Sequence, residues 1–234
     1  MGSPANLFVR DTFQDEDSTP LQDHAPDTGG NWAKAFDISS DGTIVDNMVA
    51  NPTASGYVSY VNATPTEYDG DGELTVYLKY QIPNPYTRIL SNPIKVNVDT
   101  DDGDYYDVDF ESGLIFRYIG GISDGTIVPT PDVGNRTPAT PVAGAEHEIV
   151  VRVTNTGSSV DFEIYLDGEL WQSASDTSPN RIAAAGKVGF SLDGATGVRA
   201  FEVIDFAAFD GFQLTPYEPP PPSFWAGFRL TREE

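Results

Sequence analysis

The chain has 234 residues, and 36 Asp and Glu against 13 Lys and Arg give a formal net charge of −23 at pH 7. This balance argues against nucleic acid as a direct partner, because phosphate binding depends on clustered Lys and Arg. The sequence contains no cysteine, which excludes disulfides and thiolate chemistry. The first residues lack the basic and apolar segments of a signal peptide, and no stretch approaches the roughly 18 apolar residues of a membrane span. We therefore expect no signal peptide and no membrane insertion.

Apolar and polar residues alternate with a period of two along most of the chain, between turns marked by Gly, Pro, Asn and Asp. The 22 Gly and 18 Pro are spread over the whole length, which disfavours long helices. We predict an all-β fold, a two-sheet antiparallel β-sandwich. The expected strands are Leu7–Phe13, Trp32–Phe36, Tyr57–Val61, Leu74–Ile82, Ile94–Val98, Tyr105–Phe110, Leu114–Ile119, His147–Thr154, Val160–Leu166, Lys187–Leu192 and Arg199–Phe209.

The composition divides the chain into three parts: an N-terminal arm at residues 1–6, the sandwich domain at residues 7–212, and a Pro-rich spacer with an apolar C-terminal tail at residues 213–234. Within the domain, the Gly- and Pro-rich stretch Ser123–Ala145 predicts a long surface loop. The spacer Pro216–Pro222 favours polyproline II. Three aromatic residues of the tail either pack back onto the sandwich or dock on another subunit or partner. They are Phe224, Trp225 and Phe228.

Two stretches of the sequence carry longer motifs. Residues 11–32 read DTFQDEDSTPLQDHAPDTGGNW, and residues 162–206 contain FEIYLDGEL, AAGKVGF and FEVIDF in that order. The first stretch resembles the opening phrase of concanavalin A-like lectin/glucanase domains found in phage virion proteins, and the second resembles the closing strands of that family. The resemblance spans about residues 7–210. It implies a jelly roll of two curved antiparallel sheets, often with glycan recognition and a structural calcium ion.

The residues of these motifs predict local structure as well. Asp167-Gly168 lies between two alternating runs and has the composition of a type I′ hairpin turn, in which both central residues need positive φ. Gly29-Gly30 allows a tight reversal before Trp32, whose indole we expect to be a buried anchor. His24 is expected to form a hydrogen bond within the same segment. No Ser-His-Asp order and no two-histidine metal spacing is visible, which argues against a triad hydrolase and a zinc enzyme.

The acidic run Asp99–Glu111 contains a row of residues that strand alternation places on the face opposite the core: Tyr105, Asp107, Asp109 and Glu111. This row resembles a degenerate form of the E-x-D-x-E strand of family-16-type glucanases, whose outer two carboxylates are the nucleophile and the acid/base. Retaining glycosidases hold those groups about 5–5.5 Å apart, and the shorter Asp107 misplaces the nucleophile. We therefore expect an exposed acidic face and no enzyme activity, with a glycoside hydrolase acting on a polysaccharide as the alternative.

Calcium has two candidate positions. Asp205, in the sequence VIDF, matches the carboxylate on the last long strand that binds calcium in the resembling family, and it is the preferred metal ligand. The turn Asp99–Asp104 lacks the EF-hand register, so it is either a calcium site of another kind or a solvated hairpin tip.

The resemblance, the acidity and the apolar tail together predict a non-enzymatic structural protein of a phage virion, on the surface of the particle. It would be a capsid decoration, a fibre or a tail adhesin module that contacts other virion proteins and forms a homo-oligomer, with a trimer compatible with the sequence. It either binds cell-surface polysaccharide or has a purely architectural role; a host-encoded lectin-like domain is a third reading. The expected glycan-binding residues are Tyr77, Tyr86, Tyr105, Asp107 and Asp109, with the tyrosines exposed.

Overall fold

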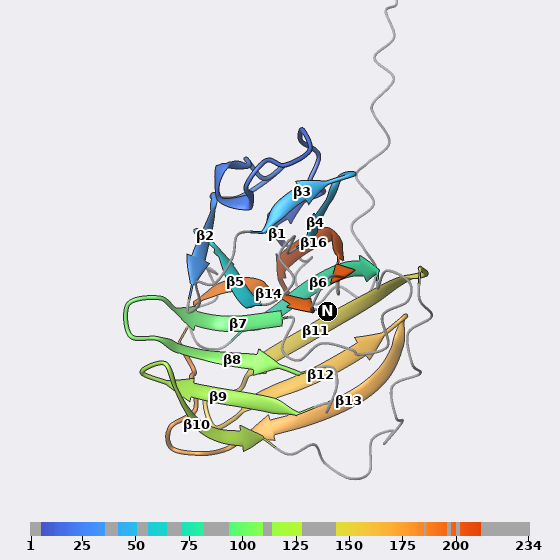
Figure 1. The fold of residues 1–234 in the computed structure, drawn as a ribbon. Coiled ribbons are helices and arrows are strands. Elements are labelled where there is room, and N and C mark those ends of the chain that lie inside the picture. The colour runs from blue at the N-terminus through green and yellow to red at the C-terminus, as the bar shows by residue number, and fades with distance from the viewer. Residues whose placement is uncertain are drawn as a thin grey trace, which may run out of the picture.

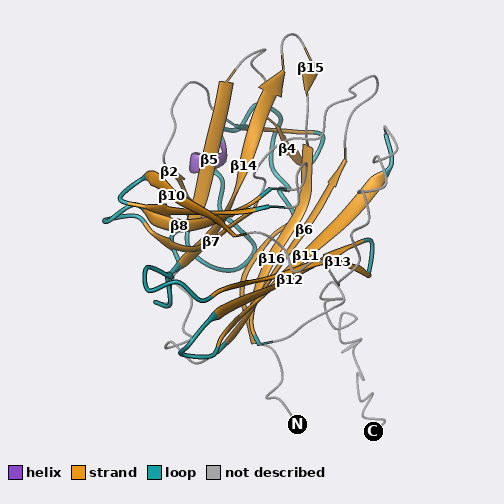
Figure 2. Ribbon diagram, turned by 90° about the horizontal axis from the view of Figure 1, so that it is seen from below, coloured by secondary structure: helices purple, strands orange, loops and turns teal. Residues whose placement is uncertain are grey.

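The computed structural model describes residues 6–35, 42–50, 56–64, 72–81, 94–109, 114–127, 144–184, 186–195, 198–199 and 202–211. Within these ranges the chain forms two antiparallel sheets of eight strands each, so the predicted two-sheet sandwich is confirmed. Figure 1 shows the strands in sequence colours, and Figure 2 shows the two sheets as separate layers. The described part contains one short 3-10 helix, η1 (Leu21–Asp23), and no helix in it is long and apolar enough to span a membrane.

The first sheet has the strand order β13-β12-β11-β6-β16-β4-β3, and β1 pairs with β16. Strand β16 therefore lies between elements from the beginning and the middle of the sequence. The bounds are β1 Asn6–Asp11, β3 Thr43–Val45, β4 Met48–Ala50, β6 Glu73–Gln81, β11 Glu146–Asn155, β12 Val160–Leu166, β13 Glu169–Asp176 and β16 Glu202–Asp210.

The second sheet has the order β10-β9-β8-β7-β14-β5-β2, and β15 pairs with β14. A bulge interrupts the pairing of β7 and β8 next to Asn97, which has a positive φ of 53°. The bounds are β2 Trp32–Ala35, β5 Gly56–Asn62, β7 Ile94–Asp99, β8 Asp104–Val108, β9 Ile115–Ile119, β10 Ile122–Ile127, β14 Lys187–Ala195 and β15 Val198–Arg199.

The main core lies between the sheets, where alternate residues of each strand point inward. On β6, Leu74, Val76 and Leu78 are fully buried, as the alternation predicts. The opposite side of β6 differs from the prediction, because Tyr77 is only 3% exposed. It belongs to a second apolar cluster on the outward face of the first sheet, together with Val150, Ala207 and Phe209.

The turn between β12 and β13 confirms the predicted hairpin. Asp167 and Gly168 have φ values of 50° and 80°, the positive values that a type I′ turn requires.

The predicted loop Ser123–Ala145 is wrong at its start, because β10 pairs with β9 there. Strand β10 is a mostly exposed edge strand with few apolar residues, so its sequence resembles a loop.

Candidate functional site

The outward face of the second sheet holds the densest group of polar and aromatic side chains among the predicted site residues. Tyr106 and Val108 of β8 point into the core, so Tyr105 and Asp107 point outward. The register places Lys95 of β7 directly opposite Asp107. Strand pairing therefore brings a lysine, a carboxylate and a tyrosine together on one face.

Lys95 and Asp107 form a buried ion pair. Lys95 Nζ donates a hydrogen bond of 2.9 Å to Asp107 Oδ1, and the two side chains are 1% and 2% exposed. The pKa of Asp107 is raised to about 6, because burial, with a smaller contribution from the charge of Asp109, outweighs the opposing effect of Lys95. Asp109 is therefore close enough to Asp107 for its charge to act on the Asp107 carboxyl.

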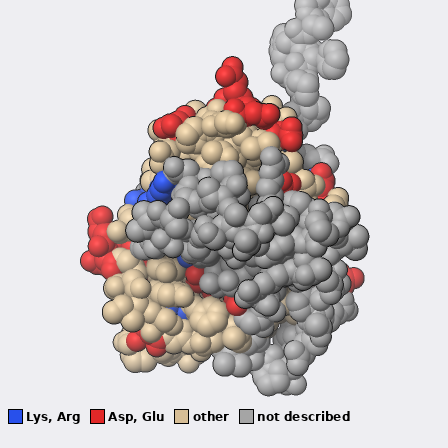
Figure 3. All heavy atoms as spheres, viewed as in Figure 1, with Lys and Arg blue, Asp and Glu red and all other residues tan. Residues whose placement is uncertain are grey.

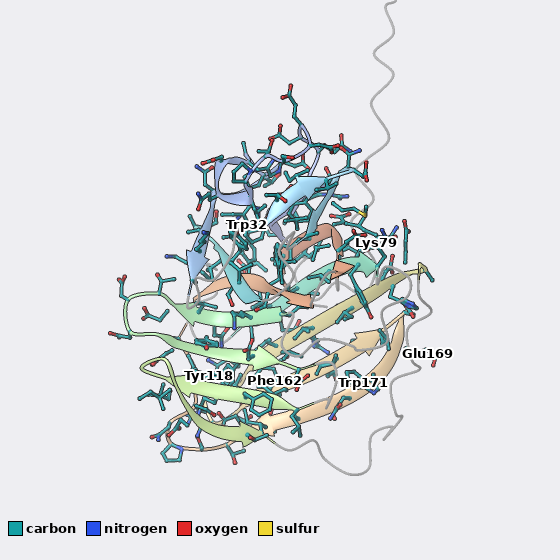
Figure 4. All side chains as sticks on the ribbon, viewed as in Figure 1. Trp32, Lys79, Tyr118, Phe162, Glu169 and Trp171 are labelled. Atoms are coloured by element: carbon teal, nitrogen blue, oxygen red, sulfur yellow. The ribbon has the colours of Figure 1, made fainter. Side chains whose placement is uncertain are left out.

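Two tyrosines cover the ion pair. Lys95 Nζ lies 4.4 Å from the centre of the Tyr105 ring, a cation–π contact. The Tyr105 ring stacks on Tyr118 of the neighbouring strand β9, with ring centres 4.4 Å apart and planes 7° from parallel. Tyr118, labelled in Figure 4, is half-buried, and so is Phe116, which lies opposite Asp107 on β9. Phe116 and Tyr118 are the more accessible aromatic residues of this face.

The structure corrects the expectation of an exposed acidic face. Tyr105, Asp107 and Asp109 are 6%, 2% and 7% exposed, and Tyr77 is buried on the outward face of the other sheet. Alternation gave the correct face for Tyr77, Tyr105 and Asp107, but each of these outward side chains is buried by its neighbours on that face. Tyr86, Glu111 and the aromatic residues of the tail, Phe224, Trp225 and Phe228, lie outside the described residues.

Asp205 has a different partner from the calcium ion that the sequence predicts. Arg10 Nη2 donates a hydrogen bond of 3.0 Å to Asp205 Oδ2, while Asp205 Oδ1 is buried without a hydrogen-bond partner. Burial raises the pKa of Asp205 to about 6, and Arg10 opposes the shift. The ranges described above gather no group of three or more His, Asp or Glu side chains suited to a metal. Asp205 alone does not complete a calcium site, which takes about six to eight oxygen ligands, so calcium at Asp205 stays a prediction.

The N-terminal motif forms a hydrogen-bond network around Asp11, which is fully buried. The Asp11 carboxylate accepts hydrogen bonds from Trp32 Nε1 at 2.6 Å and from the Phe13 backbone N–H at 2.7 Å, and it contacts His24 Nε2 at 2.8 Å. His24 Nδ1 also lies 3.1 Å from Asp15 Oδ2. Trp32 is 2% exposed, which confirms the predicted anchor. This network joins the segment after β1 to β2 and to the core, so its role is structural.

A second polar cluster joins edge strands of the two sheets. Arg117 of β9 points into the sandwich, where its guanidinium contacts Asp124 of β10 and Asp176 of β13. Tyr106 donates a hydrogen bond of 2.7 Å to the same oxygen of Asp176. The sequence reasoning missed Arg117, although the alternation in I-F-R-Y-I places Arg117 on the face opposite Phe116 and Tyr118.

The sequence reasoning also missed Lys95, Phe116 and Tyr118. For the two aromatic residues, the period-two pattern of residues 115–119 was a usable signal, because it places both on the side opposite Ile115. For Lys95 no signal exists, since an outward lysine on a strand is usually solvated. Outside this site, acidic residues gather at the surface of the segment between β1 and β2, at the top of the view in Figure 3.

No family model and no curated protein matches the sequence. Among solved structures, the carbohydrate recognition domain of Emp47p has a TM-score of 0.51 at 12% identity, covering 90% of this chain and 100% of that chain. Peanut lectin with a 9mer peptide has a TM-score of 0.49 at 12% identity, covering 89% and 98%. The exoplasmic/lumenal domain of VIP36, in a Ca²⁺/Man-bound form, has a TM-score of 0.48 at 10% identity, covering 86% and 91%. The chain therefore has the concanavalin A-like lectin fold, a two-sheet antiparallel sandwich.

Proposed function

We propose that this chain is a non-enzymatic carbohydrate-binding module of a phage virion, with its glycan site on the outward face of the second sheet. One observation carries the choice of face: Phe116 and Tyr118 present half-buried rings on β9, directly beside the Lys95–Asp107 pair. Aromatic rings with a few fixed polar groups are the usual composition of sites for small ligands. The fold, which the Emp47p carbohydrate recognition domain shares, supports carbohydrate as the ligand class.

In this proposal the two aromatic residues bind the sugar and the residues beneath them fix their position. Tyr105 stacks under Tyr118, which leaves the other side of the Tyr118 ring for the C–H groups of a pyranose. Burial raises the pKa of Tyr118, as do Asp107 and Asp109, so its phenol stays protonated and can donate a hydrogen bond at neutral pH. The buried Lys95–Asp107 pair holds β7 and β8 in register below the site.

Glycan-array screening followed by calorimetry tests this assignment. We expect a polysaccharide ligand whose affinity falls at least about tenfold, or 1.4 kcal/mol, in Tyr118→Ala and in Phe116→Ala. Tyr165→Ala is the matched control, because Tyr165 is a partly buried tyrosine on the outward face of the first sheet. An equal loss in the control contradicts the chosen face. No binding across surface polysaccharides, together with stable attachment to particles, favours a purely architectural module.

A glycoside hydrolase is the second candidate, because Asp107 on the outward face of β8 and Asp109, just beyond the end of that strand, are two carboxylates that interact electrostatically. The Lys95–Asp107 hydrogen bond weighs against it, since a nucleophile that is 2% exposed and paired with an ammonium group does not reach a sugar. Turnover of β-glucans that Glu111→Gln abolishes supports the hydrolase. No turnover on a broad polysaccharide panel dismisses it.

The virion location rests on the motif of residues 11–32 and on the net charge of −23. An acidic surface keeps a densely displayed protein soluble and away from packaged genome. In this proposal the chain contacts other virion proteins, forms a homo-oligomer such as a trimer, and docks through the aromatic residues of its tail. Immunogold labelling of purified phage particles and native mass spectrometry of the isolated protein test location and stoichiometry. Unlabelled particles contradict the virion role.

Calcium remains part of the proposal as a structural ion near Asp205. Elemental analysis and thermal unfolding with and without a chelator test it. Bound calcium and a lower melting temperature in chelator support the ion, and an unchanged melting temperature with no bound calcium contradicts it.

A further inference from the structure

We propose that Lys95 and Asp107 form an intramolecular isopeptide bond, which joins β7 and β8 covalently. The proposal starts from the geometry of the pair: Lys95 Nζ lies 2.9 Å from Asp107 Oδ1, on directly opposed residues of adjacent strands. Two groups held at such a distance react as if at very high concentration. The pair is therefore positioned for attack of the amine on the carboxyl carbon.

The surroundings of the pair favour an amide over two charges. Lys95 and Asp107 are 1% and 2% exposed, and the Tyr105 ring lies against the amine. Buried charges lose the stabilisation of water, whereas an amide carries no charge. Exclusion of water also suppresses hydrolysis, the reverse reaction.

We assign Asp109 as the group that carries the proton that the reaction must move. It is 7% exposed, and its charge acts on the carboxyl of Asp107. It follows Asp107 by two residues, which keeps it on the same outward face. The site therefore contains an amine, a carboxyl and a second carboxylate, the three groups that amide formation needs.

The reaction balances without an oxidant or a co-reactant. Proton transfer within the ion pair gives a neutral amine on Lys95 and a carboxylic acid on Asp107. Nζ attacks Cγ of Asp107 and forms the C–N bond, while Asp109 accepts the second proton of the nitrogen. The C–O bond of the acid then breaks, the leaving hydroxide takes the proton from Asp109, and one water molecule is released.

The intact mass of the full chain tests the proposal. We expect the wild-type protein to lack the mass of one water molecule, and Lys95→Arg, which keeps the charge but removes the amine, to have the full mass. Lys79→Arg is the matched control, because Lys79 pairs with Glu146 on a solvent-accessible part of the first sheet; this variant keeps the deficit. Proteolysis of the wild type should release a branched peptide that joins residues 95 and 107.

Two results overturn the bond. One is a wild-type chain of full mass after prolonged incubation. The other is a deficit that survives in Lys95→Arg, because dehydration at an Asp-Gly sequence such as Asp102-Gly103 loses the same mass without Lys95. Asp109→Asn tests the proton carrier: full mass in a folded variant supports it, and an unchanged deficit overturns that role. The wild-type measurement needs no variant to fold.

Discussion

Replacing Asp11 with Ala tests whether the hydrogen-bond network around Asp11 stabilises the sandwich. The substitution removes a fully buried carboxylate that contacts three groups: Trp32 Nε1, the Phe13 N–H and His24 Nε2. A hydrogen bond to a charged group contributes about 1.5–3 kcal/mol, and a buried donor without a partner is costly. The three contacts share one acceptor and are not additive, so we expect a loss of about 4 kcal/mol.

That loss is large enough to measure by two methods. For a chain of this size, 1 kcal/mol corresponds to about 2–4 °C, so the melting temperature should fall by about 8–16 °C. Urea unfolding should show a lower midpoint at an unchanged slope. Asp15→Ala is the control, because Asp15 lies at the surface, where its carboxylate contacts the other side of the His24 ring and accepts a hydrogen bond from the exposed Glu16 N–H; its effect should be much smaller.

A double-mutant cycle separates the hydrogen bonds from other effects of the substitution. Trp32→Phe keeps a ring in the core but removes the N–H donor to Asp11. We expect the combined variant to lose less than the sum of the two single losses, with a coupling of about 1–2 kcal/mol. An Asp11→Ala variant within about 1 kcal/mol of the wild type, or additive single losses, refutes the reasoning.

Three further substitutions test pH dependence and packing. Burial lowers the pKa of His24, but its contacts with two carboxylates raise it above the ordinary value on balance. The stability that this imparts is present below about pH 6.5 and is lost as pH rises through the raised pKa, so the advantage of the wild type over His24→Gln in thermal unfolding should shrink at alkaline pH. The raised pKa of Asp205, about 6, means that its contribution is complete below about pH 4 and is lost as pH rises through 6. Asp205→Asn should therefore gain melting temperature relative to the wild type between pH 4 and about pH 7, and parallel curves contradict this. Gly189→Ala should destabilise by about 3 kcal/mol or more in urea, because the new Cβ would lie 2.0 Å from the Tyr60 carbonyl oxygen; a variant of wild-type stability shows that the strands yield there.

The sequence was sufficient where local chemistry decides the structure. The alternation in β6 identified Leu74, Val76 and Leu78 as core residues, and Asp167-Gly168 identified the hairpin, because strand period and positive φ are local properties. Trp32 was predictable for a related reason, since a large apolar ring after a glycine turn is usually buried.

The sequence was insufficient where pairing over long distances decides the surroundings of a residue. Alternation gives the face on which Tyr77 and Tyr105 lie, but it does not reveal that neighbouring side chains bury both residues on that outward face. Asp205 needed a partner, yet Arg10 is 195 residues away in sequence and becomes its neighbour only through the pairing of β1 with β16. Lys95 meets Asp107 through cross-strand register, which no single segment encodes.

The position of β16 has a consequence for how the protein is made. This strand fills the middle of the first sheet, between β6 and β4, and also pairs with β1. During synthesis on a ribosome, β1 and β6 therefore emerge long before the strand that joins them. The backbone edges with which they pair with β16 stay open until about residue 210 has been synthesised. Slow closure of this kind exposes a chain to aggregation. A net charge of −23 makes nascent chains repel one another during that interval.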